Sequence, residues 1–339
     1  MTSLYVDRRG VTLKADGEAL VFYENNARVG TVPLAPLSRV FLRGDVTLSS
    51  SLLGKLGARG IGVVVLSGRK AEPTLLLGRP HNDAARRVAQ YRLSQDAAFC
   101  LRFAQGVVEA KLRSQAGFLA ERRDEEPRSR YLLTHVLRRL ENAIAGVSQQ
   151  TSAGSLRGLE GAGAAAYFEG FGDLLPERLG FSSRNRRPPK DPVNAALSLG
   201  YTLLHAETVL ALYGTGFDPF IGFYHALDFG RESLACDVVE PLRVEVDRHM
   251  LHLFRSEKLR ADDFSTVDGR CWLGKAGRAR FYAEWESLAE RLRKRLAEAG
   301  RDLAAALGQT EVPASDAPDQ ANDTGDALTD DADTAAEAF

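Results

Sequence analysis

Over the first 80 residues, hydrophobic and polar positions alternate in short runs that are rich in β-branched and aromatic side chains. Alternation of this kind is typical of half-buried β-strands. Serine residues followed by a leucine-spaced stretch predict one short helix between strands near Val46 and Ile61. Residues 1–80 are therefore expected to form a small β domain of strands with one short helix. Turn-forming residues break the runs and predict hairpins at Arg8-Arg9-Gly10, Asp16-Gly17 and Asn25-Asn26.

Beyond residue 80 the hydrophobic pattern takes on the spacing of α-helices. Apolar residues fall at helical spacing from Asp83 to about Gly117. We expect an α+β protein in which residues 81–87 form a linker and residues 88–308 form a larger, all-α domain. Further helical segments are predicted at 130–147, 156–171, 192–213, 231–257 and 277–307.

Charge divides the chain of 339 residues into two unequal parts, although its formal net charge is only −1. Residues 309–339 hold nine acidic residues, no Lys or Arg, and almost no large apolar side chains. Such a segment buries too little surface to offset its ordering entropy, so a disordered acidic tail is expected. The remaining 308 residues hold all 44 basic residues and 36 acidic ones. This basic body suits an anionic partner such as nucleic acid.

The cysteines and the hydrophobic runs narrow the protein class further. Three widely spaced cysteines without a CxxC motif (Cys100, Cys236 and Cys271) argue against a disulfide framework and against a zinc knuckle. No secretion signal begins the chain, and no apolar run approaches the roughly 18 residues of a membrane span. We expect a cytoplasmic protein without a membrane partner.

The first candidate for chemistry is Glu160, in the segment LRGLEGAGAAAYF at 156–168. The glycine pattern after it superficially matches a dinucleotide fingerprint, but that mechanism requires a preceding strand, and the upstream segment here is helix and loop. The small residues instead suit a helix that another helix approaches closely. Glu160 is then either a functional carboxylate or a solvent-facing one.

The second candidate is the segment GFYHALDFGRESLACDVVEPLR at 222–243. Asp237 and Glu240 are three residues apart, which places both carboxylates on one helix face. An imidazole from His225 with several carboxylates would suit Mn²⁺ or Mg²⁺ better than Zn²⁺. The alternative is that the two carboxylates pair with Arg231 and Arg243.

The third candidate is a basic loop at 183–194, whose prolines keep it extended. It is either a phosphate-binding loop or a solvated one. The basic side chains are Arg184, Arg186, Arg187 and Lys190.

In their order along the chain and in the distances between them in the sequence, these three segments resemble the CRISPR adaptation integrases of the Cas1 family. The resemblance covers about residues 3–300. The resemblance implies a helical catalytic domain with Glu160, His225 and Glu240 as catalytic and metal-binding residues and Asp237 as an assisting acidic residue that is a further candidate metal ligand. Mg²⁺ or Mn²⁺ is the implied cofactor. Expected DNA contacts come from the four basic residues of the loop and from Arg231.

The resemblance also implies a reaction and partners. Members of the family join a short double-stranded DNA, the prespacer, to a CRISPR repeat by attack of a 3′-hydroxyl on a phosphodiester, and they act as nucleases when water replaces that hydroxyl. A homodimer formed through the β domain and a Cas2 dimer are the implied protein partners. A noncatalytic DNA-binding scaffold is the alternative function.

Overall fold

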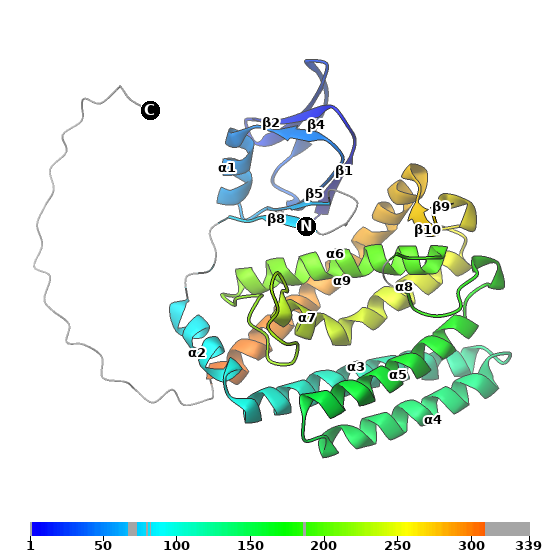
Figure 1. Ribbon diagram of the computed structural model, residues 1–339. Helices are drawn as coiled ribbons and strands as arrows, with labels where there is room; N and C mark the ends of the chain where they lie inside the picture. The colour runs from blue at the N-terminus through cyan, green and yellow to red at the C-terminus, as the bar shows by residue number, and fades with distance from the viewer. Residues whose placement is uncertain (1, 67–72, 79–80, 82, 186–187, 309–339) are drawn as a thin grey trace, which may run out of the picture.

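The computed structural model describes residues 2–66, 73–78, 81, 83–185 and 188–308. Within these ranges the chain forms a β-rich N-terminal part followed by a helical part, so the predicted fold class is confirmed (Figure 1). The three cysteines are unpaired. The predicted acidic tail at 309–339 and two residues of the predicted basic loop, Arg186 and Arg187, lie outside the described residues.

The N-terminal part contains two four-stranded sheets and one short helix. One sheet has the order β1-β5-β7-β8 and the other the order β4-β3-β2-β6. Helix α1 (Ser50–Ala58) begins after Ser49, whose side chain accepts a hydrogen bond from the backbone N–H of Leu52. The strands are β1 (Thr2–Asp7), β2 (Val11–Asp16), β3 (Ala19–Glu24), β4 (Ala27–Pro33), β5 (Leu37–Arg43), β6 (Val46–Leu48), β7 (Gly62–Val65) and β8 (Thr74–Leu76).

Two of the three predicted hairpins are present. Strands β2, β3 and β4 pair antiparallel, and the turn between β3 and β4 holds Asn25 and Asn26 at positive φ, which asparagine tolerates. The predicted hairpin at Arg8-Arg9-Gly10 is wrong, because β1 and β2 lie in different sheets. Strand β1 instead pairs parallel with β5.

The burial of β5 explains this parallel pairing. Val40 and Leu42 pack into the core of the β domain, whereas Phe41 faces the helices. A strand that is apolar on both faces is typical of the centre of a sheet with parallel neighbours, and β5 pairs parallel with both β1 and β7. Alternation along the chain cannot distinguish such neighbours from hairpin partners.

The helical part follows the predicted segments with two interruptions and one addition. Asp96 caps a new helix, so the stretch from 83 to 117 contains two helices. The predicted helix at 231–257 is broken by a 3-10 turn at Glu240–Leu242, which contains Pro241. A hairpin of β9 (Phe264–Val267) and β10 (Arg270–Leu273) was not predicted. The helices are α2 (Ala84–Ser94), α3 (Ala97–Glu125), α4 (Arg130–Gly146), α5 (Ala153–Asp173), α6 (Pro192–Gly214), α7 (Ser233–Val239), α8 (Arg243–Arg255) and α9 (Lys275–Gly308).

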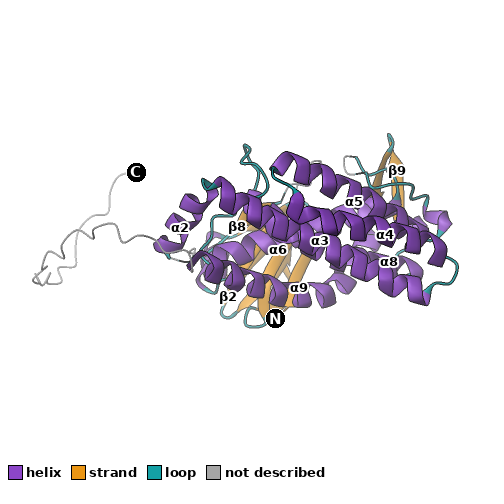
Figure 2. Ribbon diagram, turned by 90° about the horizontal axis from the view of Figure 1, so that it is seen from below, coloured by secondary structure: helices purple, strands orange, loops and turns teal. Residues whose placement is uncertain are grey.

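The long helices run side by side along one axis, and α6 lies among α7, α8 and α9 (Figures 1 and 2). Helix α6 is long and apolar enough to cross a membrane by length and composition alone, but most of it is buried against its neighbours. Helices α3 and α5 approach closely because α5 has glycine at the crossing. A Cβ on Gly163 would lie 2.5 Å from the Cδ2 atom of Leu112. This contact places α3 directly beside the turn of α5 that carries Glu160.

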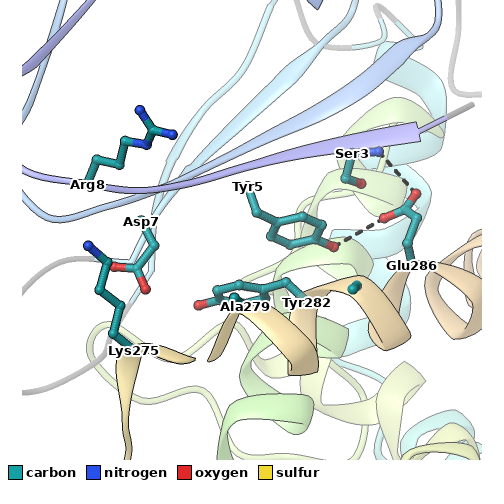
Figure 3. A pocket seen from close by; sticks show the side chains of 9 residues that line it. Ser3, Tyr5, Asp7, Arg8, Lys275, Ala279, Tyr282 and Glu286 are labelled. Atoms are coloured by element: carbon teal, nitrogen blue, oxygen red, sulfur yellow. Dashed lines mark hydrogen bonds between the residues drawn. The ribbon is translucent and has the colours of Figure 1, made fainter. Parts of the chain in front are cut away.

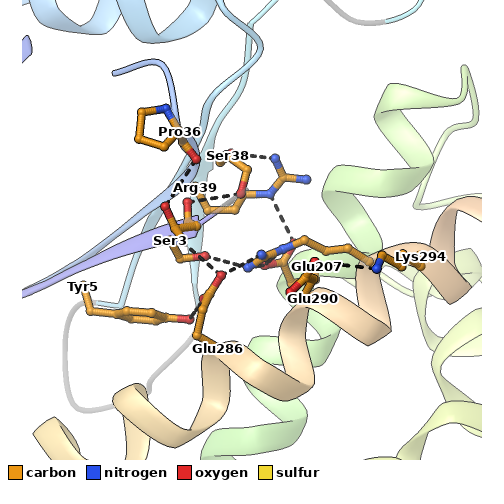
Figure 4. Close-up of polar contacts among 11 residues, drawn as sticks. Ser3, Tyr5, Pro36, Ser38, Arg39, Glu207, Glu286, Glu290 and Lys294 are labelled. Atoms are coloured by element: carbon orange, nitrogen blue, oxygen red, sulfur yellow. Dashed lines mark hydrogen bonds and ion pairs between the residues drawn. The ribbon is translucent and has the colours of Figure 1, made fainter. Parts of the chain in front are cut away.

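A charged seam joins the β domain to α6 and α9. Glu207 of α6, whose side chain is fully buried, accepts hydrogen bonds from Arg39 of β5 at 3.1 Å and from Arg293 of α9 at 2.8 and 3.0 Å (Figure 4). Arg293 also binds Glu286 at 2.9 Å. A cavity of about 500 Å³ lies beside this network.

A second cavity, of about 430 Å³, lies along the same seam between β1 and α9 (Figure 3). The ring of Tyr5 stacks on Tyr282 with 4.7 Å between centroids, and its hydroxyl donates to Glu286 at 3.2 Å. Burial, followed by the charge of Glu286, raises the pKa of Tyr5. The seam is thus a packed, hydrogen-bonded joint, and its cavities are not lined by any predicted site residue.

Candidate active site

Glu160 lies on α5, one turn after the buried Leu156, and its side chain is 15% exposed. Its Oε1 atom forms an ion pair with the ammonium of Lys111, on α3. Its Oε2 atom accepts a hydrogen bond from the hydroxyl of Tyr224. Burial and the bond to Glu160 raise the pKa of Tyr224 well above its usual range, so this hydroxyl stays protonated and donates. The carboxylate therefore does not face open solvent.

Glu240 lies in the 3-10 turn that follows α7 and is 6% exposed. Its Oε1 atom accepts a hydrogen bond from Arg243 at 2.9 Å, and its Oε2 atom lies 2.7 Å from the ammonium of Lys111. The contact to Lys111 is a close ion pair but lacks the direction of a hydrogen bond. Burial acts to raise the pKa of Glu240, but the charges of Arg243 and Lys111 outweigh it and hold the pKa at about 2. Glu240 is therefore ionised at neutral pH.

Lys111 brings the two glutamates together. It occupies a core-facing position of α3 and is 8% exposed. A buried lysine is costly unless its charge is paired, and here two carboxylates from separate elements pair with it. Glu160 and Glu240, which are 80 residues apart in the sequence, thus share a single cation.

His225 lies in the loop before α7, and its orientation comes from Asp237. The Oδ1 atom of Asp237 accepts hydrogen bonds from the backbone N–H of His225 at 2.9 Å and from the Nδ1 atom of its ring at 2.7 Å. This bond places a ring proton on Nδ1, so in the neutral ring Nε2 is the nitrogen that carries the lone pair. The pairing of a carboxylate with Nδ1 is the usual support of a metal-binding histidine.

Asp237 has no oxygen left for a direct role at the glutamates. Its Oδ2 atom accepts the backbone N–H groups of Phe223 at 2.8 Å and Tyr224 at 3.1 Å. Glycine at position 222 allows the loop to approach Asp237 this closely, since a Cβ there would lie 2.8 Å from the Oδ2 atom. Asp237 is fully buried and holds the loop that carries both Tyr224 and His225.

The sequence left two interpretations of Asp237 and Glu240 open: metal ligands together with His225, or partners of Arg231 and Arg243. The structure gives a different result for each of the two residues. The pair of Glu240 with Arg243 is present, whereas Asp237 binds the loop and His225 rather than Arg231. In the part of the chain that the structure describes, no three His, Cys, Asp or Glu side chains already lie close enough together to hold a metal ion. Lys111 stands between the two candidate glutamate ligands.

The basic residues predicted to contact DNA lie in different environments. Arg184 donates to Asn194 at 2.7 Å and lies over the ring of Tyr201, which Arg243 also contacts. Lys190 is exposed, at the start of α6. Arg231 is exposed on the loop after His225, beside the thiol of Cys236.

Sequence reasoning missed Lys111 and Tyr224 as members of this site. Tyr224 lies within the second candidate segment, next to His225, but a tyrosine at that position is equally typical of a core residue. One feature of the sequence could have indicated Lys111: it is a lone lysine at a core-facing position, one turn after Val108 and next to Leu112, both of which are buried. Such a lysine needs an acidic partner, but the sequence does not show which one.

The fold and this site define a class of protein: an N-terminal β domain joined to a helical domain in which two glutamates with little exposure and an oriented histidine come from α5, the loop before α7 and the 3-10 turn after α7. Residues 4–287 match the family described as CRISPR associated protein Cas1. The chain is 40% identical over 296 residues to the CRISPR-associated endonuclease Cas1 1 of Thermodesulfovibrio yellowstonii, covering 86% of this chain and 93% of that protein. The chain belongs to the Cas1 family, which confirms the resemblance.

Two solved structures share the fold. A chain of a Cas6-RT-Cas1–Cas2 complex is 26% identical, with a TM-score of 0.77, and the match covers 91% of this chain and 35% of that one. A casposase bound to integration product is 20% identical, with a TM-score of 0.74, and the match covers 94% of this chain and 96% of that one. The fold is therefore shared with a chain of a Cas6-RT-Cas1–Cas2 complex and with a casposase that was solved bound to integration product.

Proposed function

We propose that this protein is a metal-dependent DNA endonuclease and integrase of CRISPR spacer acquisition, which inserts prespacer DNA into the repeat array. The observation that carries the proposal is the arrangement of Glu160 and Glu240 on one cation, beside a histidine that Asp237 orients. Membership of the Cas1 family and the fold shared with a casposase bound to integration product support it. In the proposal the protein works in the cytoplasm, without a membrane partner.

The residues present fit a Mg²⁺ or Mn²⁺ ion. Two carboxylates and one imidazole form a hard, oxygen-rich donor set. The ammonium of Lys111 shows that a cation can be shared between the Oε1 atom of Glu160 and the Oε2 atom of Glu240. In this proposal Glu160, Glu240 and His225 would hold the ion, and Asp237 would assist by orienting His225. When bound, the ion would offset the negative charge that grows on a phosphate under attack.

The protein's own groups prepare that site for a phosphodiester. Tyr224 and Arg243 each hold one oxygen of a glutamate and so fix the direction of the other oxygen. Asp237 fixes the histidine ring and excludes its second tautomer. Such fixed groups need no reorganisation when charge develops, which is the main way in which active sites lower barriers.

The proposed reaction exchanges one phosphodiester for another. The oxygen of the prespacer 3′-hydroxyl forms a bond to the phosphorus of one phosphodiester in the repeat. The bond between that phosphorus and the 3′-oxygen of the repeat strand breaks. The attacking hydroxyl loses its proton and the leaving oxygen gains one, so a new 3′-hydroxyl results. No covalent bond to the protein forms. With water as the attacking group the same exchange becomes DNA cleavage.

Positive side chains of the basic loop at 183–194, together with Arg231, are proposed to position DNA through its phosphates, without reading sequence. They are Lys190, Arg231 and Arg184, with Arg186 and Arg187 of the same loop. We also propose a homodimer formed through the β domain and assembly with a Cas2 dimer. The presence of a similar chain in a Cas6-RT-Cas1–Cas2 complex supports the Cas2 partnership.

Strand transfer of a labelled prespacer into a repeat-bearing plasmid, with Mn²⁺ present, tests the function. His225→Ala should lower the rate at least about a hundredfold, because it removes one of the proposed ligands of the ion that would offset charge on the reacting phosphate. His252→Ala is the matched control, since His252 is exposed on α8 outside the site and its loss should leave the rate unchanged. A folded His225→Ala protein with the wild-type rate would refute the assignment.

A noncatalytic DNA-binding scaffold is the second candidate function. One observation favours it: Lys111 and Arg243 already balance the charges of the two glutamates without any metal. A scaffold would bind DNA but would not bind Mn²⁺ at these carboxylates and would transfer no strands.

A further inference from the structure

Each candidate glutamate has one oxygen held by a fixed group and the other turned toward Lys111. Tyr224 holds the Oε2 atom of Glu160, and Arg243 holds the Oε1 atom of Glu240. The two remaining oxygens meet only the ammonium of Lys111 in the contacts described above. Both carboxylates thus direct one oxygen at the same point, and a cation already occupies that point.

Lys111 and Arg243 hold their carboxylates in different ways. The guanidinium of Arg243 lies over the ring of Tyr201, with 4.7 Å to the centroid, so both its plane and its direction are fixed. Lys111 holds Glu240 by a close ion pair of 2.7 Å whose geometry is less directed than that of the hydrogen bond from Arg243. A lysine has a flexible stem of four methylenes, and the side chain of Lys111 is still 10% exposed, so its ammonium can withdraw.

Charge balance requires this withdrawal when metal enters. Two carboxylates are neutralised by Lys111 and Arg243 in the arrangement described here. A divalent ion added to the same oxygens would bring two further positive charges against the ammonium at close range, which is strongly repulsive in a buried site. The ion and the ammonium therefore exclude one another.

We propose that Lys111 is a resident cation of the metal-free protein: it holds Glu160 and Glu240 together until a divalent ion displaces it, and it thereby sets the affinity for that ion. Lys111 is a positioning residue in this scheme and touches no substrate. The inference rests on the proposed function, because it takes these glutamates to be metal ligands.

Two opposite changes follow for Lys111→Gln, which keeps hydrogen-bonding capacity but removes the charge. The metal-free protein should melt at a lower temperature, because two buried carboxylates lose a shared partner. Mn²⁺ should bind more tightly, by about 5- to 150-fold, because the competing charge is gone. Mn²⁺ should therefore raise the melting temperature of the variant more than that of the wild type.

The experiment measures melting temperature and Mn²⁺ affinity, by calorimetry at about pH 8, where carboxylates are ionised. Lys258→Gln is the matched control, because Lys258 pairs with Glu284 on the surface, and its Mn²⁺ affinity should equal that of the wild type. If Lys111→Gln does not fold without metal, the double variant Lys111→Gln, Glu160→Gln restores charge balance. It should fold without Mn²⁺ and bind Mn²⁺ more weakly than the wild type.

The outcomes separate this inference from the proposed function. A wild-type protein that binds no Mn²⁺ would refute the metal site itself. A wild-type protein that binds Mn²⁺, together with a Lys111→Gln protein of equal or weaker affinity, would leave the site intact and overturn the role of Lys111.

Discussion

Among the described residues, the candidate active site and the seam between the β domain and the helices both pair buried carboxylates with cations, and they do so in opposite ways. At the seam a single carboxylate, Glu207, has both oxygens bonded to two guanidiniums, those of Arg39 and Arg293. At the site two carboxylates share one ammonium, and each keeps one oxygen for it.

The difference shows what distinguishes a structural ion pair from a site that can exchange its cation. Burial and opposite charge are common to both clusters. The seam uses arginines, whose planar, branched heads are bonded to Glu207, Glu286 and Ser3. The site instead has a flexible lysine, and its two ion pairs among the described residues are with the oxygens that a metal would also use. We infer that the seam fixes geometry and that the site holds a replaceable charge.

The largest expected effect comes from the seam. Glu207→Ala leaves two largely buried guanidiniums without their shared carboxylate, which should lower the free energy of unfolding by about 3–5 kcal/mol. Urea denaturation measures this loss. Glu290→Gln is the control, because Glu290 pairs with Lys294 at the surface and should change stability by less than about 1 kcal/mol. Equal effects of the two variants would mean that the seam is not a rigid joint.

The next effect concerns the response of Glu240 to acid. Its pKa lies at about 2 in the folded protein, below the value of 4.5 for a free side chain, so its ionised form stabilises the fold. This contribution is fully present above about pH 4.5 and is lost as the pH falls toward 2. The difference in unfolding free energy between wild type and Glu240→Gln should stay constant from about pH 7 to 5 and shrink by about 2 kcal/mol near pH 3.

A series of urea titrations at successive pH values measures this difference. A constant difference down to about pH 3 would show that Lys111 and Arg243 do not hold the carboxylate in its charged form. A difference that grows as the pH falls from about 7 to 5 would indicate a raised pKa in the folded protein and would contradict the low pKa of Glu240 directly.

Much of the fold could be predicted from the pattern of residues, because local spacing determines local structure. Alternation located the N-terminal strands, and the serines before Leu52 located α1. Contacts between distant strands carry no such signal, which is why the parallel pairing of β1 with β5 was missed. The broken helix at Glu240 could have been inferred from Pro241, which cannot continue the backbone hydrogen bonds of a helix.

The sequence names candidate residues for the site but does not reveal how they are arranged. The spacing of Asp237 and Glu240 suggested one helix face, yet the 3-10 turn at Glu240 separates their directions, and Asp237 binds the loop of His225 instead. Lys111 enters the site only because Gly163 lets α3 approach α5. That approach is a property of the packed helices and cannot be inferred from either segment alone.

The central claim is that Glu160, His225 and Glu240 hold a divalent ion in the place that Lys111 occupies in the metal-free protein. Anomalous diffraction at the manganese absorption edge, from crystals soaked in Mn²⁺, tests it most directly. The account predicts an anomalous peak between the Oε1 atom of Glu160, the Oε2 atom of Glu240 and the Nε2 atom of His225, with the ammonium of Lys111 moved away. A Mn²⁺ peak elsewhere, with Lys111 still paired to both glutamates, would contradict it.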